Sequence, residues 1–505
     1  MKRSRFTIML LMTAAFAHGQ HRITIDVNKK AQVIDNIGSS GAWFSEGIGK
    51  YWSPEIREQM ARWLFSKGFK KDGSPEGIGL SSWRFNIGGG TAEQGDSSGI
   101  RDFRKRVECF LKPDGTYDWS KQSGYLWFTK KARAYGVETL IAFSNTPPVW
   151  MNQNGLGYKT AKDHRSNLKV DQYNAYADFL TRVWQHFDKE GLHFDYISPV
   201  NEPQWDWSNP YGEASQEGTA WTNEEVVRVA GALDTALARA KANTKILLSE
   251  AGHLEYLYAQ EGTASHQIQA LKKGGVYGLS HVPAIIGGHS YFTDNGDSSR
   301  RAIREHVRDT AAKYGLQYWQ TEYSMLADGY KEGHEGPRTA MDCALFLAKV
   351  IHNDFVYGNA SAWQFWNSWE PGRADVDTRY YLVALHPKDN SYKDGTVTAV
   401  KNLWALGQYS RFVRPGMHRV MAESGDPALL VSAFVSKNQV VLVCVNEGEE
   451  AKIISVDVKG RRYKKLRYYE TSKDEDMGAH LVKAGNPENE QIELKKRSVV
   501  TVVME

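Results

Sequence analysis

Two kinds of hydrophobic pattern divide the chain. Up to about residue 414, short apolar runs alternate with segments whose apolar positions recur every three or four residues, as in amphipathic helices. Several of the runs are apolar without alternation, which is typical of parallel strands covered on both faces. Eight runs are predicted to be strands: 33–44, 80–90, 137–148, 194–203, 245–253, 285–292, 317–324 and 360–369.

The segments between these runs carry helix signals. Ser53 followed by Pro54 is typical of a helix start, and Thr222 with Glu225 forms a capping box. Eight strands, each followed by a crossover, predict an α/β fold in which residues 36–414 form a (β/α)8 TIM barrel. Further helices are expected near 123–135, 171–187, 299–314, 337–352 and 399–411.

After Pro415 and Gly416 the pattern changes to short alternating runs separated by turn residues. This pattern predicts a C-terminal antiparallel β-sandwich domain over residues 415–505. Residues 20–35 also have the alternation of strands, and we expect them to pair with that domain.

The first nineteen residues have the composition of a signal peptide. Lys2, Arg3 and Arg5 precede the apolar stretch FTIMLLMTAAFA, and small residues follow it. We therefore expect an exported protein, periplasmic or extracellular, whose mature chain starts near Gln20. No later stretch has eighteen consecutive apolar residues, so no membrane span is predicted.

The composition of the chain limits the classes of molecule that it could bind. The net charge is only +4 over 505 residues, and there is no basic run of the kind that binds nucleic acid. The 16 Trp and 25 Tyr fit either large cores or a carbohydrate cleft, because sugar rings pack their C–H faces on aromatic rings. The three cysteines, Cys109, Cys343 and Cys444, have no zinc spacing and form no disulfide framework. A single disulfide bond between two of them remains an alternative.

In a (β/α)8 barrel the active site lies at the carboxyl ends of the strands. Polar and aromatic residues gather at the ends of the predicted strands. The candidate substrate-binding residues among them are Arg84, Asn86, Asn145, Trp150, Asn201, Trp205, His289, Tyr291 and Trp369.

Two carboxylates at these ends point to catalysis. Glu202 ends the fourth strand in SPVNEP (198–203), and Glu322 ends the seventh, on the opposite side of an eight-stranded barrel. Such a pair suits glycosidic bond cleavage, with retention when the carboxyl groups lie about 5–5.5 Å apart and inversion when they lie farther apart. A Glu after a strand is more often a cap or an ion-pair partner, but the two together favour catalysis. Glu250 is the rival carboxylate, which either binds substrate or pairs with Arg84.

Other motifs in the chain give weaker evidence of function. The stretch NIGGG (86–90) lacks the spacing of a phosphate-binding loop, and there is no HExxH, GxSxG or EF-hand pattern. Asp294 and Asp297 could hold a loose cation, but we predict neither a metal nor a cofactor. His289 and Tyr291 could be core residues, and for Tyr291 we favour a hydrogen bond to the nucleophilic carboxylate.

Four stretches resemble glycoside hydrolase family 30, and the resemblance covers nearly the whole mature chain. They are LSSWRFNIGGG (80–90), SPVNEP (198–203), WQTEYS (319–324) and WALGQYSRFVRPGM (404–417). The resemblance implies a retaining double displacement with Glu202 as acid/base and Glu322 as nucleophile. It also places Arg84, Asn201 and Tyr291 where the family has substrate and support residues.

Within that family, NTPPVWMNQNG (145–155) and the glycines at 88–90 resemble the endo-β-1,6-galactanase branch. Other branches cut β-1,6-glucan or glucuronoxylan, and an exo-acting β-glycosidase is also open. A non-catalytic carbohydrate-binding protein is the alternative of another class, although the presence of both glutamates argues against it. For the C-terminal domain, a structural role is favoured over sugar binding by Tyr463, Tyr468 and Tyr469.

Overall fold

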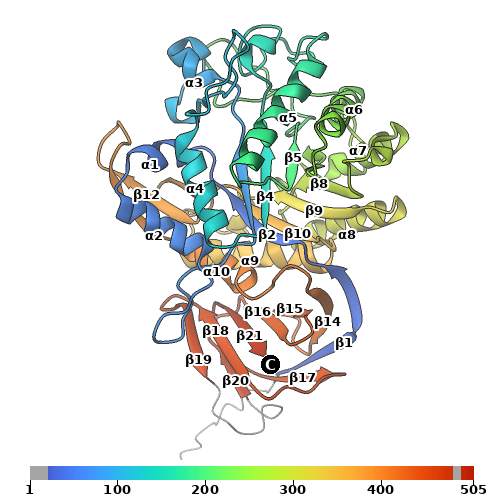
Figure 1. Ribbon diagram of the computed structural model, residues 1–505. Coiled ribbons are helices and arrows are strands. Elements are labelled where there is room, and N and C mark those ends of the chain that lie inside the picture. Colours follow the sequence, from blue (N-terminus) through green and yellow to red (C-terminus); the bar gives the residue numbers. More distant parts are fainter. Residues whose placement is uncertain (1–20, 482–490) are drawn as a thin grey trace, which may run out of the picture.

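The computed structural model describes residues 21–481 and 491–505, and it contains a barrel with a β-domain packed beneath it (Figure 1). The predicted signal peptide lies outside the described residues. Within those residues, no helix combines the length and the apolar character needed to cross a bilayer.

The barrel is a ring of parallel strands. Its strands are β2 (Asn36–Ser40), β3 (Ser82–Asn86), β4 (Thr139–Phe143), β5 (Tyr196–Ser198), β6 (Lys245–Ile246), β7 (Ser249–Ala251), β8 (Ile285–His289), β9 (Gln317–Glu322) and β10 (Ala362–Phe365). Their order is β6-β5-β4-β3-β2-β10-β9-β8-β7. The two edge strands are halves of one predicted run. Leu247 N donates to Ile197 O (2.9 Å) on one side and Gly287 N donates to Leu248 O (2.6 Å) on the other, so the ring closes.

The strands form where the sequence predicts them, and the TIM-barrel prediction is confirmed. All eight runs contain a strand, and the fifth run is divided between β6 and β7. The barrel interior is closed at one level by a small apolar cluster from five runs. It consists of Ile141, Leu247, Ile285, Trp319 and Ala362, with Tyr196 packed against it.

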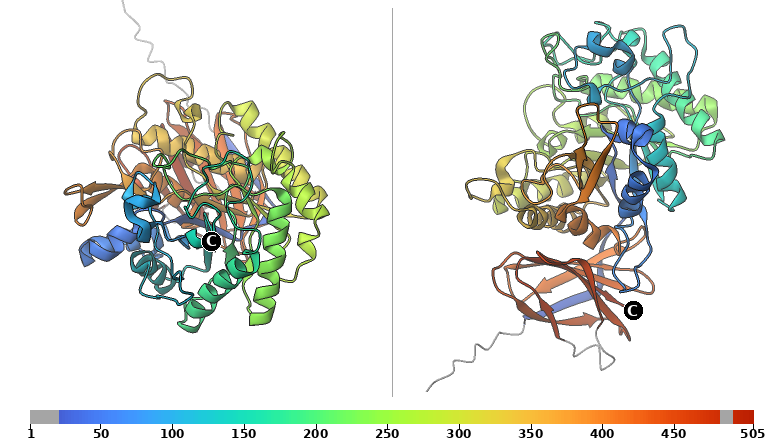
Figure 2. Two further views of the ribbon diagram at one scale, coloured as in Figure 1. Left: turned by 90° about the horizontal axis from the view of Figure 1, so that it is seen from above. Right: turned by 90° about the vertical axis from the view of Figure 1, so that its left-hand side faces the viewer.

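Helices surround the barrel when it is seen from above (Figure 2, left). The longer ones are α2 (Pro54–Phe65), α4 (Ser123–Ala134), α5 (Tyr173–Lys189), α6 (Asn223–Ala240), α8 (Asp297–Lys313), α9 (Ala340–Val356) and α10 (Lys401–Ser410). Both predicted helix starts are confirmed: the Ser53 side chain accepts from Ile56 N, and Thr222 and Glu225 form a complete capping box.

Three short helices and a small sheet were not predicted. The helices are α1 (Ser45–Tyr51), α3 (Thr91–Gln94) and α7 (Gln267–Lys273), and the sheet contains β11 (Trp369–Pro371), β12 (Val383–Pro387) and β13 (Gly395–Ala399). The short SEGIGKY segment of α1 contains two glycines, which are poor helix formers. Trp52, directly after α1, donates from Nε1 to Tyr392 O (2.9 Å), so α1 packs on the β12–β13 hairpin (Figures 1 and 2).

The β-domain is one largely antiparallel, nine-stranded sheet. Its strands are β1 (His21–Val33), β14 (His418–Ser424), β15 (Leu429–Val435), β16 (Val440–Asn446), β17 (Lys452–Lys459), β18 (Leu466–Thr471), β19 (Asp476–Leu481), β20 (Gln491–Leu494) and β21 (Ser498–Met504). Strand β1 lies inside this sheet, antiparallel to β14 and parallel to β17.

Alternation along β16 explains how the domain attaches to the barrel. Val441, Val443 and Val445 belong to the large core shared with the barrel, whereas the intervening Leu442 and Cys444 belong to the separate core of the β-domain. The sheet thus packs one face beneath α9 and α10 (Figure 1) and the other on its own core.

The cysteines and the tyrosines of the β-domain are the subject of two alternatives that the sequence left undecided. All three cysteines are buried free thiols, so the open disulfide alternative is wrong. In the β-domain, Tyr463 and Tyr469 are buried, and Tyr468 stacks on His480 with ring centroids 4.7 Å apart. These tyrosines are occupied within the domain, which favours the structural role over sugar binding.

Candidate active site

A cleft of about 640 Å³ lies at the carboxyl ends of the barrel strands. Six of the residues predicted from the sequence line it: Asn145, Asn201, Glu202, Trp205, Tyr291 and Glu322. The structure therefore brings both candidate catalytic glutamates to one cavity.

The backbone at Glu202 is tightly held. Glu202 follows β5 in the left-handed region (φ +45°), and its N–H donates to Glu250 O at 2.8 Å. Its carbonyl accepts from Trp205 N and from Trp207 Nε1, both at 3.2 Å. A Cβ at Gly252 would lie 2.8 Å from the Glu202 carboxyl carbon, so that position has room only for glycine. These contacts fix the direction of the Glu202 side chain.

Glu322, at the end of β9, is held by two donors. Arg84 Nη1 on β3 donates to Glu322 Oε1 at 2.5 Å, and the Tyr291 hydroxyl donates to Oε2 at 3.2 Å. The Arg84 guanidinium is buried and lies 4.3 Å from the centroid of the Phe143 ring. One face of Glu322 is thus occupied by the protein, while the residue still lines the cleft.

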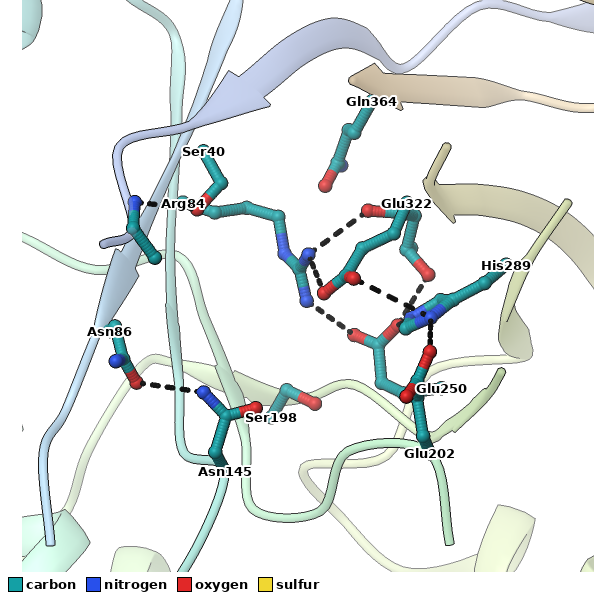
Figure 3. A network of polar contacts seen from close by, with 12 residues as sticks. Ser40, Arg84, Asn86, Asn145, Ser198, Glu202, Glu250, His289, Glu322 and Gln364 are labelled. Atoms are coloured by element: carbon teal, nitrogen blue, oxygen red, sulfur yellow. Dashed lines mark hydrogen bonds and ion pairs between the residues drawn. The ribbon is translucent and has the colours of Figure 1, made fainter. Parts of the chain in front are cut away.

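Glu250 lies beside Glu202 and contacts Arg84 and His289, the groups that hold the two glutamates (Figure 3). Its carboxylate lies 3.6 Å from Arg84 Nη2 and 3.3 Å from His289 Nε2, and it accepts from the Thr321 hydroxyl. The Glu250 side chain is fully buried and does not line the cleft. Of the two alternatives, its position fits pairing with Arg84 and not contact with substrate.

His289 connects Glu250 to Glu202. Its Nδ1 lies 2.9 Å from Glu202 Oε1 and 3.6 Å from Glu322 Oε2. Burial alone would lower the pKa of His289, but the charge of Glu322 and the hydrogen bonds to Glu202 and Glu250 outweigh it and raise that pKa to about 10. At neutral pH His289 is therefore an imidazolium, and its two N–H groups face the carboxyl groups of Glu202 and Glu250.

The pKa values of two buried carboxyl groups in the site are shifted in opposite directions. The pKa of Glu202 is raised, chiefly because burial disfavours its charged form, although His289 opposes the shift. Burial also acts on Glu250, but the Arg84 charge and the His289 hydrogen bond outweigh it, so the pKa of Glu250 is lowered. A carboxyl group with a raised pKa beside one with a lowered pKa is the arrangement expected of an acid catalyst and its support.

One carboxylate oxygen of Glu202 and one of Glu322 lie within 4.8 Å of each other, with a His289 ring nitrogen within the same distance of both. These three side chains have the spacing of a metal site. However, both nitrogens of His289 already face carboxylates, and Arg84 already neutralises Glu322. This donor set therefore does not fit a cation.

Other predicted residues lie away from the cleft wall. Asn86 is buried, and its Oδ1 lies 3.5 Å from Asn145 Nδ2, so Asn86 can orient a residue that does line the cleft. Trp150 is half-buried and packs close to Gly90, where an added Cβ would lie 3.3 Å from its ring.

Trp369 was predicted to bind substrate, and this prediction is wrong. The residue is fully buried, with its ring 4.5 Å from Phe128 and 5.7 Å from Trp83 between centroids. A ring with no exposed face cannot stack on a sugar. Trp366, three residues earlier, lines the cleft instead.

Much of the cleft wall was not predicted from the sequence. The lining residues outside the prediction are Trp43, Lys105, Trp207, Gln216, Phe292, Ser324, Leu326, Trp366, Glu370 and Tyr380. Trp43 and Trp366 fall at the ends of predicted strands and could have been found, and their rings meet edge to face at 5.9 Å. Phe292 and Ser324 also end predicted strands. The remaining six lie outside the predicted strands and helices, where no hydrophobic period shows which side chain faces inward.

Comparisons with known proteins agree with this geometry. A family model described as O-Glycosyl hydrolase family 30 matches residues 20–377. An endo-β-1,6-galactanase of Hypocrea rufa is 21% identical over 470 residues, covering 90% of this chain and 86% of the relative. The glucuronoxylanase XynC of Bacillus subtilis is 24% identical over 285 residues, covering 55% of this chain and 54% of the relative.

Among solved structures, a conserved exported protein from Bacteroides fragilis superposes with a TM-score of 0.86 at 30% identity. The match covers 95% of this chain and 99% of that one.

Proposed function

The chain belongs to O-glycosyl hydrolase family 30 and is an O-glycosyl hydrolase, and from this premise we propose that it is a retaining β-glycosidase. Glu202 acts as the acid/base and Glu322 as the nucleophile. The main observation that supports this assignment is that a carboxylate oxygen of each residue lies within 4.8 Å of one of the other. This closeness favours retention, because inverting enzymes keep their carboxyl groups about 6.5–9.5 Å apart to admit a water molecule.

The reaction proceeds in two displacements. A Glu322 carboxylate oxygen attacks the anomeric carbon while protonated Glu202 gives its proton to the leaving glycosidic oxygen, forming a glycosyl-enzyme ester and releasing one product. Glu202, now ionised, then takes a proton from water as the water oxygen attacks the anomeric carbon. The ester bond breaks, Glu322 returns to the carboxylate and Glu202 is protonated again.

The surroundings of each glutamate support its assigned role. The raised pKa of Glu202 keeps a proton available for the leaving group. Arg84 and Tyr291 hold Glu322 in place, which lowers the entropic cost of reaching the attack geometry. His289 donates to Glu202 and can stabilise the carboxylate that forms once the proton has been transferred.

For the substrate, we propose a β-1,6-linked galactan that is cut internally. The support is the relative from Hypocrea rufa, which matches over most of both chains, and the cleft wall, where Trp205 and Trp366 offer rings to sugar faces. Alternatives with the same mechanism are a β-1,6-glucanase, a xylanase and an exo-acting β-glycosidase.

We also propose that the protein is exported to the periplasm or the cell exterior. The basic and apolar start of the chain supports this proposal, and the Bacteroides fragilis relative is described as exported.

The product profile tests the proposed substrate. The purified protein is incubated with debranched β-1,6-galactan, β-1,6-glucan, glucuronoxylan and aryl β-glycosides, with Glu322→Gln as the inactive control. Short galacto-oligosaccharides from the first substrate alone are expected. Cleavage of a different polymer would replace the substrate and keep the mechanism, whereas binding without cleavage of any of them would contradict the proposed activity.

A further inference from the structure

A second hollow of about 290 Å³ adjoins the catalytic cleft. Trp43 lines both cavities. The short 3-10 helix Phe103–Lys105 separates them, because Lys105 lines the cleft while Phe103 and Arg104 line the hollow. The hollow therefore lies beside the cleft, between α1 and the β12–β13 hairpin.

Two aromatic side chains in this hollow are more exposed than their size leads one to expect. Tyr51, at the end of α1, is 55% exposed, and Phe103 is 52% exposed. Both line the same small cavity, together with Tyr392 of the hairpin. Large rings gathered around a cavity and left open to solvent mark a binding surface more often than scattered single exposures do.

The wall of the hollow is rigid. The Arg104 guanidinium lies 4.1 Å from the Tyr392 ring centroid and 5.1 Å from that of Phe44. The same guanidinium makes two hydrogen bonds to Asp102, at 2.7 and 2.6 Å. Trp52 Nε1 holds the Tyr392 carbonyl at 2.9 Å. These contacts hold the Tyr392 and Phe44 side of the wall in place before any ligand arrives, which reduces the entropic cost of binding.

The charges in the hollow are largely paired. Lys50 contacts Glu46 and lies 3.0 Å from Glu108, and Arg104 pairs with Asp102. Arg106, also in the wall, lies 2.8 Å from Asp96. With these charges neutralised, the hollow offers ring faces and hydrogen-bonding groups to a neutral ligand. Neutral sugars present apolar C–H faces and hydroxyl groups, which is the matching chemistry.

We propose that this hollow is a remote glycan subsite that receives neutral sugar units of the same galactan whose reacting bond lies in the cleft. The proposal rests on the proposed function. Its basis is the shared Trp43, the Phe103–Lys105 partition and the exposed rings of Tyr51 and Phe103. The volume of about 290 Å³ is near the lower end for small-ligand sites, so it suits a short stretch of a chain held mainly elsewhere.

The test compares long and short substrates in variants of the hollow. Phe103→Ala, Tyr51→Ala and the double variant are measured for retardation in gels containing debranched β-1,6-galactan, for KM on that polymer, and for kcat/KM on an aryl β-galactoside. Phe69→Ala is the matched control, because Phe69 is similarly exposed (47%), lies outside both cavities and stacks on Tyr469 of the β-domain.

We expect weaker retardation of the variants than of the parent protein. We also expect their KM on the polymer to rise roughly 3- to 10-fold for each aromatic ring removed. The aryl substrate is too short to reach the hollow, so its kcat/KM should stay within about twofold, and Phe69→Ala should match the parent protein. Unchanged retardation and KM in the double variant would overturn the subsite while leaving catalysis intact. Equal losses on polymer and aryl substrate would overturn it as well, because they indicate a structural effect on the active site.

Failure of the proposed function gives a different pattern. If the parent protein cleaves none of these substrates but is retarded by galactan, the gel shifts of the variants still decide the role of the hollow. If the parent is not retarded by galactan at all, the subsite proposal is wrong as stated.

Discussion

The imidazole Nδ1 of His289 lies 2.9 Å from the Oε1 atom of Glu202. The other ring nitrogen faces Glu250 at 3.3 Å, and Glu250 also lies 3.6 Å from the guanidinium of Arg84, the group that holds Glu322. Glu250 is thus the anion shared by the two cations that hold the two proposed catalytic carboxylates. This arrangement predicts that Glu250 acts through its neighbours and not on the substrate.

The first prediction concerns the charge of His289. Glu202, Glu250 and Glu322 all face its ring, and we expect it to stay doubly protonated from pH 6 to 9, with a pKa of about 10. Nuclear magnetic resonance of protein labelled with ¹⁵N-histidine measures this directly. Glu250→Gln removes one stabilising anion and should lower that pKa. A His289 ring that titrates near 6.5 in the parent protein would refute this account of the network.

The same shift has a consequence for stability. Because the pKa of His289 is raised above the value of 6.5 in an unfolded chain, its contribution to stability is fully present below pH 6.5 and is lost as the pH rises through about 10. The loss should be smaller in Glu250→Gln. Thermal unfolding between pH 6 and 10 checks this, and an identical decline of Tm in both proteins would contradict it.

The second prediction concerns the acid/base. Glu202→Gln should lose about 10²- to 10⁴-fold in kcat/KM on polymer, where the leaving group needs a proton. Aryl glycosides with acidic phenols need no such help, so their glycosylation step should be largely spared. The alkaline limb of the pH–rate profile, which reports deprotonation of Glu202, should disappear with these substrates. Equal losses on both substrate types would remove Glu202 from this role.

The third prediction concerns the nucleophile. Glu322→Gln should reduce turnover on every substrate, on the order of 10⁴-fold or more, because no covalent intermediate can form. Glu335→Gln is the matched control: Glu335 is exposed, and it does not line the cleft. Initial rates on an aryl glycoside compare the two variants. A mild loss in Glu322→Gln would mean that another group attacks the substrate.

The fourth prediction concerns a buried carboxyl group outside the reaction. Glu217 is fully buried and accepts from Gly89 N (3.2 Å) and the Thr91 hydroxyl (2.6 Å), which ties the glycine-rich turn after β3 to the loop after β5. Burial raises the pKa of Glu217 to about 8. Between pH 4.5 and 8 the unfolded chain has lost this proton while the folded chain keeps it, so stability falls as the pH rises.

Glu217→Gln keeps a neutral side chain and should remove this dependence. We therefore expect the Tm of the variant, relative to the parent, to rise from pH 5 to pH 8, whereas exposed Glu213→Gln should show no such trend. A constant difference across this range would show that Glu217 is already ionised in the folded protein.

The barrel and the position of its candidate catalytic pair could be predicted because they follow from regular patterns. Strand periodicity located all eight runs, and strand ends located Glu202 and Glu322. Trp369 was misassigned because strand periodicity stops at β10, so the sequence could not show that the chain turns this ring inward onto Phe128. Lys105 lies in a short 3-10 helix and Tyr380 in a loop, and the paths of both segments depend on tertiary contacts that leave no local signal.

The role of Glu250 was also beyond the sequence. A Glu at a strand end has the same appearance whether it binds a sugar or supports its neighbours. The supporting role is indicated by the complete burial of Glu250 and by its contacts with Arg84 and His289, which lie on other strands of the barrel.

The most direct test of the central claim is covalent trapping with an activated 2-deoxy-2-fluoro-β-galactoside. The fluorine slows hydrolysis of the glycosyl-enzyme, so the intermediate accumulates and can be weighed by mass spectrometry of the intact protein and then of its peptides. We predict one added fluorogalactosyl group, located on Glu322, and no label in Glu322→Gln. Label on Glu202 or Glu250, or turnover of the parent galactoside without any label on the enzyme, would contradict the assignment of Glu202 and Glu322 as the retaining pair.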